Sequence, residues 1–368
     1  MKGFHAITHV WGRAYLDLFL NICIPNQLAQ GNVPALPPGS RYRILTRSDH
    51  VDELTTHPMV EALRQRIPVD IVAVAALKPD TGTRSSLDQM IACHRLAIAE
   101  AGGAVLLFLS ADIVFSSTAF AAVVRRQQEG YRAVVTTGLR LAKEPFLRAL
   151  DRALLPSLSS RDLVRLALPH LHQHERDMWR KAKPSIARPV AVHWPVGEVG
   201  LLTRSFHLHP LMVDPISPTI ELDGTIDDRY LSAACPDPSR IYAVTDSDEL
   251  QVFELTTENQ EILRRRAAGM SVHAVTNQAL RCAALHLQNW ERTVIRVHAD
   301  DLDNQWRKVE AESQVFAASV MRALRMAQMR RAMRRYVKRA SIERRWRRFH
   351  KRVARTLRIL RSRLKRYG

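Results

Sequence analysis

Apolar residues in the first 140 positions form short continuous runs, and amphipathic stretches of helical spacing separate these runs. The apolar runs cover residues 4–10, 42–46, 69–74, 104–109 and 133–137. Continuously apolar strands are typical of a parallel sheet that is covered on both faces, and strands that alternate with helices build an α/β domain. The pattern therefore predicts an α/β fold with an open, mostly parallel, Rossmann-like sheet.

The pattern changes after this first half of the chain. Residues 140–195 are rich in Leu, Arg and His and are expected to be helical or irregular. From residue 257 onward we expect only helix. Further strands are expected at 196–203, 240–245 and 251–255. The predicted parts are an α/β domain over 1–255, a helical region over 256–320 that packs on it or extends from it, and a helical tail over 321–368.

The tail over residues 321–368 carries the whole net charge of the chain. It holds 20 Lys and Arg residues against one acidic residue, Glu343, whereas the rest of the chain holds 35 of each sign. Its apolar residues recur every three or four positions, which places them in one stripe of a helix. They are Trp346, Phe349, Val353, Leu357, Leu360, Leu364 and Tyr367. The tail is thus a cationic amphipathic helix, and the net charge of +19 belongs to it alone.

Three partners suit such a helix. An anionic membrane surface suits it best, because the apolar stripe can enter the interface while each basic residue near the leaflet contributes about 1 kcal/mol. Nucleic acid is second, since charge alone gives non-specific binding, although no nucleic-acid module accompanies the tail. Packing against the domain or a second copy would leave most of the charge uncompensated. Four scattered cysteines, without a signal-peptide or membrane-spanning pattern, favour a cytoplasmic protein at the inner membrane surface.

The best candidate for chemistry follows the apolar run at 104–109. Ligands of open α/β sheets bind at the carboxyl ends of the strands, and this run continues directly into Ser110, Ala111 and Asp112. A lone carboxylate in that place is suited to hold a divalent cation or a polar ligand. The alternative is an aspartate that only caps the following turn.

The sequence Leu-Phe-Leu-Ser-Ala-Asp-Ile-Val-Phe-Ser around Asp112 resembles the strand and Asp-x-Asp turn of GT-A glycosyltransferases. The resemblance covers roughly residues 4–255 and rests on the order of the elements and on this turn. In that family the turn carboxylates bind Mn²⁺ or Mg²⁺, which bridges the two phosphates of a nucleotide-sugar donor. Ser110 stands where the first aspartate of the pattern is expected, so the implied site holds its divalent cation weakly or not at all.

The resemblance also implies residues that contact the donor. They are expected at the ends of the first two strands, on the helix before the turn, and in the turn itself. The implied donor-binding residues are His5, Thr8, Thr46, Arg47, Arg84, Arg95, Ser110 and Asp112. An arginine on that helix could pair bidentately with a diphosphate. The alternatives are a solvated helix face and core histidines with ordinary partners.

Two later segments add candidates. Some metal-dependent members of the family use a late histidine as an extra ligand, so the resemblance implies Asp112 with His207 or His209 as metal ligands. Four carboxylates crowd into residues 221–228, where inverting members carry an acidic pair that deprotonates the acceptor hydroxyl. Asp227 and Asp228 are therefore the implied catalytic residues, and a solvated acidic loop is the alternative.

The predicted function is that of a glycosyltransferase that moves a sugar from a nucleotide-diphosphate donor to a membrane-proximal or surface-polysaccharide acceptor. Two alternatives stay open. One is a non-catalytic binding protein with the nucleotide-sugar fold, which the replacement of the first aspartate by Ser110 favours. The other is a nucleic-acid-associated protein that acts through its basic tail. Whether the transfer would invert or retain the configuration of the sugar is open too.

Overall fold

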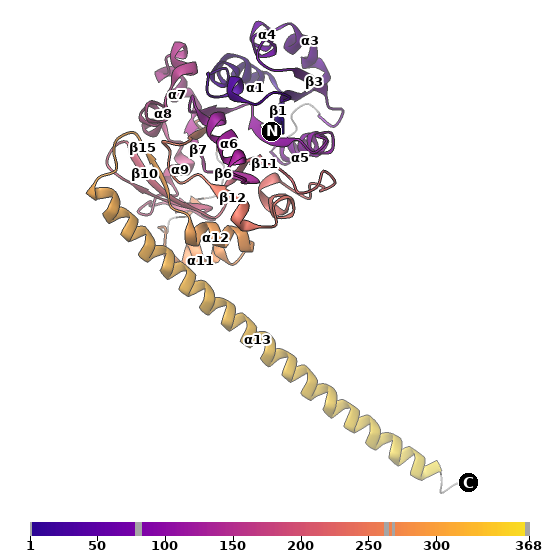
Figure 1. The fold of residues 1–368 in the computed structure, drawn as a ribbon. Helices are drawn as coiled ribbons and strands as arrows, with labels where there is room; N and C mark the ends of the chain where they lie inside the picture. Colours follow the sequence, from indigo (N-terminus) through magenta and orange to yellow (C-terminus); the bar gives the residue numbers. More distant parts are fainter. Residues whose placement is uncertain (1, 78–82, 261–264, 267–268, 365–368) are drawn as a thin grey trace.

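The main sheet has seven strands and is mostly parallel. The computed structural model describes residues 2–77, 83–260, 265–266 and 269–364, and Figure 1 shows how their elements are arranged. All neighbouring strands pair in parallel except β11, which runs antiparallel to both β4 and β6. From edge to edge the strands are β12 (Ile241–Ala243), β6 (Ala133–Thr136), β11 (His209–Val213), β4 (Val105–Ser110), β1 (Phe4–Val10), β2 (Arg41–Thr46) and β3 (Val69–Ala73). The predicted open, mostly parallel sheet is confirmed.

Helices connect these strands, as the amphipathic stretches predicted. Residues 51–64 form two helices and not one, because Pro58 lacks an N–H and requires extended backbone at His57 (φ −71°, ψ 132°). The helices up to residue 234 are α1 (Arg13–Leu18), α2 (Ile24–Gln27), α3 (Val51–Thr56), α4 (Pro58–Arg64), α5 (Thr83–Ala99), α6 (Ala119–Gln128), α7 (Lys143–Ala149), α8 (Ser160–Ala167), α9 (Gln173–Arg176) and α10 (Leu231–Ala234). Two π-helical segments, η1 (Phe19–Cys23) and η6 (Ile226–Tyr230), lead directly into α2 and α10. Short 3₁₀ turns are η2 (Val33–Ala35), η3 (Ser48–His50), η4 (Arg152–Ser157), η5 (Leu168–His170) and η7 (Pro238–Arg240).

Two three-stranded sheets combine strands that the pattern predicted with strands that it did not; the strand expected at 251–255 is β13. Residues 140–195 were expected to be helical or irregular, yet they contain most of one strand and all of two others. The second sheet has the order β5 (Ile113–Phe115), β13 (Val252–Thr256) and β7 (Gly138–Ala142). The third has the order β15 (Ile295–His298), β10 (Gly200–Ser205) and β9 (Ala191–Pro195). The strand expected at 196–203 is thus the turn and second arm of a β9–β10 hairpin.

The expectation of helix alone after residue 257 is wrong. The segment Ile-Arg-Val-His of β15 pairs antiparallel with β10, and β14 (Arg265–Arg266) pairs with β8 (Ser185–Ile186). Ile295 and Val297 alternate with polar residues and are buried, which is the period of a strand. A four-residue run is too short to stand out against the helical signal on both sides. The helices here are α11 (Val272–Ala279) and α12 (Ala284–Arg292).

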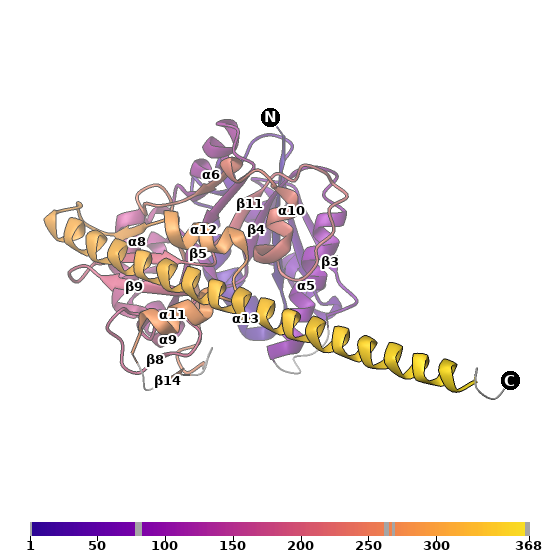
Figure 2. The same cartoon turned by 90° about the horizontal axis from the view of Figure 1, so that it is seen from below.

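The chain ends in one helix of 61 residues, α13 (Asn304–Leu364). Its first third packs against the domain through Trp306, Phe316, Val320 and Leu324, which are buried beside Trp194 and Trp290. Beyond this part the helix projects away from the domain, as both views show (Figures 1 and 2). No break occurs at residue 321, and Leu324 is the last buried side chain in the described part of the helix. None of the helices among the described residues combines the length and apolar character that a membrane crossing requires.

Candidate active site

One edge of the main sheet gathers the ends of four central strands. Parallel β1 and β4 end there together, with His9 opposite Ser110. The antiparallel β11 begins there, with His209 opposite Thr136 at the end of β6. Since ligands of open α/β sheets bind at the carboxyl ends of the strands, this edge is the candidate active site.

The 110–112 turn leaves this edge between β4 and β5. The Ser110 hydroxyl donates a hydrogen bond of 2.5 Å to Asp112 Oδ1. The Leu255 N–H donates to the backbone carbonyl of Asp112 at 2.7 Å, and the Cys23 thiol donates to that of Ala111 at 3.1 Å. These bonds fix the turn from both sides. Burial raises the pKa of Asp112, and the Ser110 hydrogen bond and the charges of Arg140 and Lys143 oppose that rise.

An ion pair lies next to the turn, in the second sheet. Arg140 on β7 stands opposite Glu254 on β13; its Nη1 donates to Glu254 Oε1 and, at 3.2 Å, to Thr256 Oγ1. Burial raises the pKa of Glu254 to about 7, Arg140 opposes this, and the charges of Asp112 and Glu175 add to it. The sequence interpretation did not include Arg140 or Glu254. Their signal was a single charged residue inside each of two apolar strands.

Three buried polar residues, Glu175, His193 and Thr203, form hydrogen bonds to one another between α9 and the third sheet. His193 is fully buried, donates from Nε2 to Glu175 Oε2 at 3.0 Å and accepts from the Thr203 hydroxyl at 2.9 Å. Burial raises the pKa of Glu175, but the hydrogen bond and charge of His193 outweigh it and the pKa is lowered. Glu175 is thereby held as a carboxylate, which explains its effect on Glu254.

Three histidines line the edge on the other side of the turn. The ring centroids of His9 and His94 lie 5.0 Å apart, and His209 Nε2 lies 3.4 Å from the carbonyl oxygen of Phe108. Burial, with a smaller contribution from the charge of His209, lowers the pKa of His9 to about 4. Burial also lowers the pKa of His94 and of His209. These rings are therefore neutral at pH 7 and offer hydrogen-bonding groups without charge.

Asp227 on η6 lies close to one of these histidines, His209. Its charge raises the pKa of His209 against the larger effect of burial. Its backbone carbonyl accepts a hydrogen bond of 3.2 Å from His286 Nε2. The structure thus brings the predicted residues Ser110, Asp112, His209 and Asp227 to one edge of the domain. Asp228 was predicted as a catalytic residue and Arg84 as a donor contact, and the side chains of both lie outside the described part of the structure.

Three predicted donor contacts are corrected by the structure. His5 is the second residue of β1 and pairs with Arg41 at the start of β2, so it lies at the opposite end of the strands from Asp112. Thr8 is fully buried and hydrogen-bonds the Tyr42 hydroxyl at 2.7 Å. Thr46 is fully buried as well and donates to the carbonyl of Val10 at 2.7 Å. The side chains of both threonines serve the interior of the sheet.

The two described arginines of the predicted donor set already have partners. Arg47 pairs with Asp49 in the loop after β2, with Nε donating to Oδ1 at 2.9 Å. Arg95 on α5 donates from Nε to the carbonyl oxygen of Leu222 at 2.9 Å. Arg95 therefore fastens α5 to the segment that leads into η6 and Asp227. Donor contacts by these two residues stay predictions.

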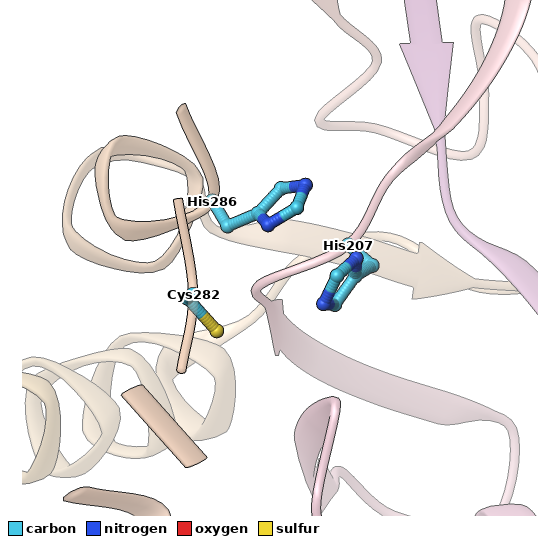
Figure 3. Close-up of side chains that lie close together, drawn as sticks. All are labelled: His207, Cys282 and His286. Carbon is cyan, nitrogen blue, oxygen red and sulfur yellow. The ribbon is translucent and has the colours of Figure 1, made fainter. Parts of the chain in front are cut away.

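No group of three ligand side chains among the described residues includes Asp112, whereas His207 belongs to such a group. His207 lies with Cys282 and His286 (Figure 3), and the ligand atoms of these three lie within 4.8 Å of one another. A hard cation at Asp112 would have this carboxylate and the Ser110 hydroxyl as its protein ligands. That set fits Mg²⁺ or Mn²⁺ shared with the phosphates of a substrate, since such ions often take only one or two carboxylates.

A second group with ligand spacing is occupied by its own contacts. Asp246 accepts from His298 Nε2 at 2.9 Å, and Asp248 is paired with Arg161 at 2.8 Å. His298 Nδ1 bonds the carbonyl of Asp300 at 2.7 Å. These bonds join β15 to the loop before β13, so this group has a structural role.

No protein-family model and no curated protein matches the chain. Among solved structures, the chain is similar to S. aureus TarS, with 9% identity over 87% of this chain and 70% of that chain and a TM-score of 0.32. A second TarS structure is matched over 43% of its length with a TM-score of 0.31. The mannosyltransferase PcManGT from Pyrobaculum calidifontis, in complex with GDP-Man and Mn²⁺, has 9% identity over 89% of this chain and 76% of its own, with a TM-score of 0.34. TM-scores this low carry no function from these proteins to this chain.

Proposed function

We propose that the protein is a glycosyltransferase that binds a nucleotide-diphosphate sugar at the 110–112 turn. The observation that carries the proposal is the position of Asp112. It follows a buried central strand at the ligand-binding edge, is held by Ser110, and lies within electrostatic reach of Arg140 and Lys143. This arrangement suits an anionic ligand that brings a cation with it.

The balance of charges around Asp112 is an argument that the donor binds together with a divalent cation. Asp112 and Glu254 are balanced by Arg140 and Lys143, so a diphosphate would add uncompensated negative charge. A divalent ion held by Asp112 and the phosphates would restore the balance and polarise the phosphates toward departure. Lys143, which donates to Thr257 at 3.3 Å and is partly exposed, would supply a further positive charge to the leaving diphosphate.

Asp227, with Asp228 as its neighbour in the chain, is the proposed catalytic base. In the transfer, the acceptor hydroxyl would give its proton to the carboxylate while its oxygen bonds to the anomeric carbon and the nucleoside diphosphate leaves. A base must lie within hydrogen-bond reach of the proton that it takes. The backbone contact to His286 and the Arg95 bond to Leu222 hold the segment that carries Asp227. His209 would orient the carboxylate from the sheet.

We further propose that α13 brings the protein to an anionic membrane surface, where lipid-linked or polysaccharide acceptors would be met. The exposed residues Met326, Met329, Met333 and Tyr336 continue the apolar stripe of the tail at helical spacing. The helix projects from the domain (Figure 2), and the described side chains of Arg330, Arg331 and Arg334 are exposed, which supports binding to a partner. Nucleic acid stays the second candidate, since the same charge would bind phosphates of a duplex.

A donor screen tests the enzymatic proposal. The full chain is mixed with UDP-sugars and GDP-sugars in the presence of Mn²⁺ or Mg²⁺, and thermal unfolding is followed. Binding to the native state raises Tm by mass action, so at least one donor is expected to raise it. A binding protein without activity would show the same rise without turnover of the donor. If no nucleotide changes Tm, the proposal fails.

A further inference from the structure

His207, Cys282 and His286 form a compact group of nitrogen and sulfur ligands near the candidate site. His207 follows β10, Cys282 lies in the turn before α12, and His286 lies in the first turns of α12. The ring centroids of the two histidines are 4.0 Å apart. In Figure 3 the three side chains point toward a common centre. Their ligand atoms lie within 4.8 Å of one another, while the ligands of a tetrahedral zinc ion are about 3.5 Å apart. Small side-chain rotations would close that difference.

The hydrogen bond of His286 suits it to ligation. Its Nε2 lies 3.2 Å from the carbonyl oxygen of Asp227 and can only donate to it. The proton is thereby placed on Nε2, which leaves the lone pair on Nδ1. Figure 3 shows that Nδ1 is the ring nitrogen turned toward His207 and Cys282. A metal-binding histidine typically donates its other N–H to a carbonyl or carboxylate in this way.

The segments that carry these ligands are held rigidly together. Phe206, next to His207, stacks on Trp290 of α12 with centroids 4.5 Å apart and an interplanar angle of 13°. Asn289 on the same helix donates to the carbonyl of Phe206 at 3.3 Å. The Ser205 hydroxyl donates to the carbonyl of His207 at 2.6 Å. The loop and the helix therefore keep their spacing whether or not a ligand is bound.

We propose that His207, Cys282 and His286 bind a borderline-soft transition-metal ion of the Zn²⁺ type. Thiolate and imidazole ligands select such ions over Mg²⁺ and Mn²⁺, which prefer oxygen. Three protein ligands leave a fourth position for water or another donor. The site is separate from the hard-cation position at Asp112 and does not depend on the proposed transferase activity. Since His286 also bonds the backbone of Asp227, a bound ion would fix the segment that carries the proposed base.

Binding would release one proton from the thiol. The thiolate, and not the thiol, is the form of cysteine that binds a metal, so Cys282 must give up its proton when the ion binds. The Cys282 S–H bond breaks, a metal–sulfur bond forms, and the proton leaves to solvent. The affinity should therefore increase with pH.

Cobalt binding to the full chain tests the site directly. Metal-free protein is titrated with Co²⁺, and the expected result is one equivalent bound with a thiolate-to-cobalt charge-transfer band. Zn²⁺ should displace the cobalt, and a large excess of Mg²⁺ should not. Cys282→Ser should remove the band. His286→Ala should weaken metal binding by about tenfold or more, because loss of a residue that only supports a metal ligand already weakens binding by about tenfold. Cys235→Ser, which alters a buried cysteine outside the group, is the matched control and should behave as the wild type.

A second measurement uses only the unmodified protein. Cys282 is partly exposed, whereas Cys23, Cys93 and Cys235 are buried, so alkylation of the native protein should mark Cys282 first. Zn²⁺ should slow the alkylation of Cys282, as read by peptide mass, while Mg²⁺ should leave it unchanged. The proposal is overturned if cobalt binds without a thiolate band, if Cys282→Ser binds as well as the wild type, or if Zn²⁺ does not protect Cys282.

Discussion

Arg140 on β7 donates a hydrogen bond to Glu254 on β13; the charge of Arg140 also acts on Asp112 in the adjacent turn, and the charge of Asp112 acts on Glu254. The side chains of the pair are 30% and 26% exposed, so water screens them only in part. The pair joins two strands that are 114 residues apart in the chain. The pair therefore links two neighbouring strands of the second sheet, and the hydrogen bond from the Leu255 N–H to the Asp112 carbonyl joins this sheet to the turn.

Replacing Arg140 by Ala should lower the free energy of unfolding by about 2–3 kcal/mol, because the largely buried carboxylate of Glu254 loses its partner. Urea unfolding followed by circular dichroism measures this. Arg41→Ala is the matched control, since Arg41 pairs with Asp70 at the surface and exposed pairs contribute about 0–1 kcal/mol. Equal losses in the two variants would contradict a structural role of the Arg140 pair.

Glu254 should make the free energy of unfolding depend on pH between about 4.5 and 7, above the range in which an ordinary glutamate titrates. Its pKa is about 7 in the folded state and 4.5 is its ordinary value, so the folded state binds the proton more tightly. The stabilisation from this proton is complete below pH 4.5 and is lost as the pH rises to about 7, with a slope of at most about 1.4 kcal/mol per pH unit. The difference in free energy of unfolding between the wild type and Glu254→Gln should therefore fall from pH 4.5 to 7. A constant difference over that range would show that Glu254 has an ordinary pKa.

Asp227→Asn should slow sugar transfer by about 100-fold or more and leave the donor dissociation constant unchanged, because a general base acts on the acceptor and not on donor binding. Asp223→Asn is a suitable control, since Asp223 is exposed and paired with Arg229 in the same acidic segment. Rates from product formation and affinities from calorimetry separate the two effects. A variant that keeps full activity would exclude Asp227 as the base.

Much of the sheet could be predicted from local pattern, and the ends of its strands led to Asp112. The strand β4 is continuously apolar and buried, which is why it was found within one residue. The strand β11 begins with His209 and Pro210 and β7 carries Arg140, so both lack a continuous apolar run. A strand pairing between distant segments leaves no local signal, and it is what brings Arg140 to Glu254.

The lack of a local signal for contacts between distant segments also explains which candidate residues were predicted and which were missed. Position in the sheet singled out Asp112 as a candidate, and the structure adds buried histidines at the same edge of the sheet. His5 is the second residue of the run predicted at 4–10, so its place at the start of β1, away from Asp112, was already contained in that prediction. His207 was expected near Asp112, but its neighbours come from residues 282–286. Such partners depend on how α12 packs on the third sheet, and no spacing in the sequence encodes that.

Removal of residues 326–368 should abolish binding to anionic vesicles and leave the domain folded. Leu324 is the last buried side chain in the described part of α13, so the free energy of unfolding should change by less than about 0.5 kcal/mol. Flotation with anionic and zwitterionic vesicles measures the binding, which salt should weaken. Duplex DNA retention serves as the competing assay. If the full chain retains DNA but does not float with anionic vesicles, the membrane proposal is wrong.

The central claim is that Asp112 holds the sugar donor, and donor turnover tests it most directly. The substrate is the nucleotide-sugar donor that raises Tm in the thermal screen, and its rate of hydrolysis is measured for three proteins. These are the wild type, Asp112→Asn, and the control Asp52→Asn, which alters an exposed aspartate on α3. We predict that Asp112→Asn lowers the rate by about 100-fold or more, since contacts that stabilise charge on a leaving phosphate contribute that much, and that Asp52→Asn has the wild-type rate. Equal rates for Asp112→Asn and the wild type would contradict the account.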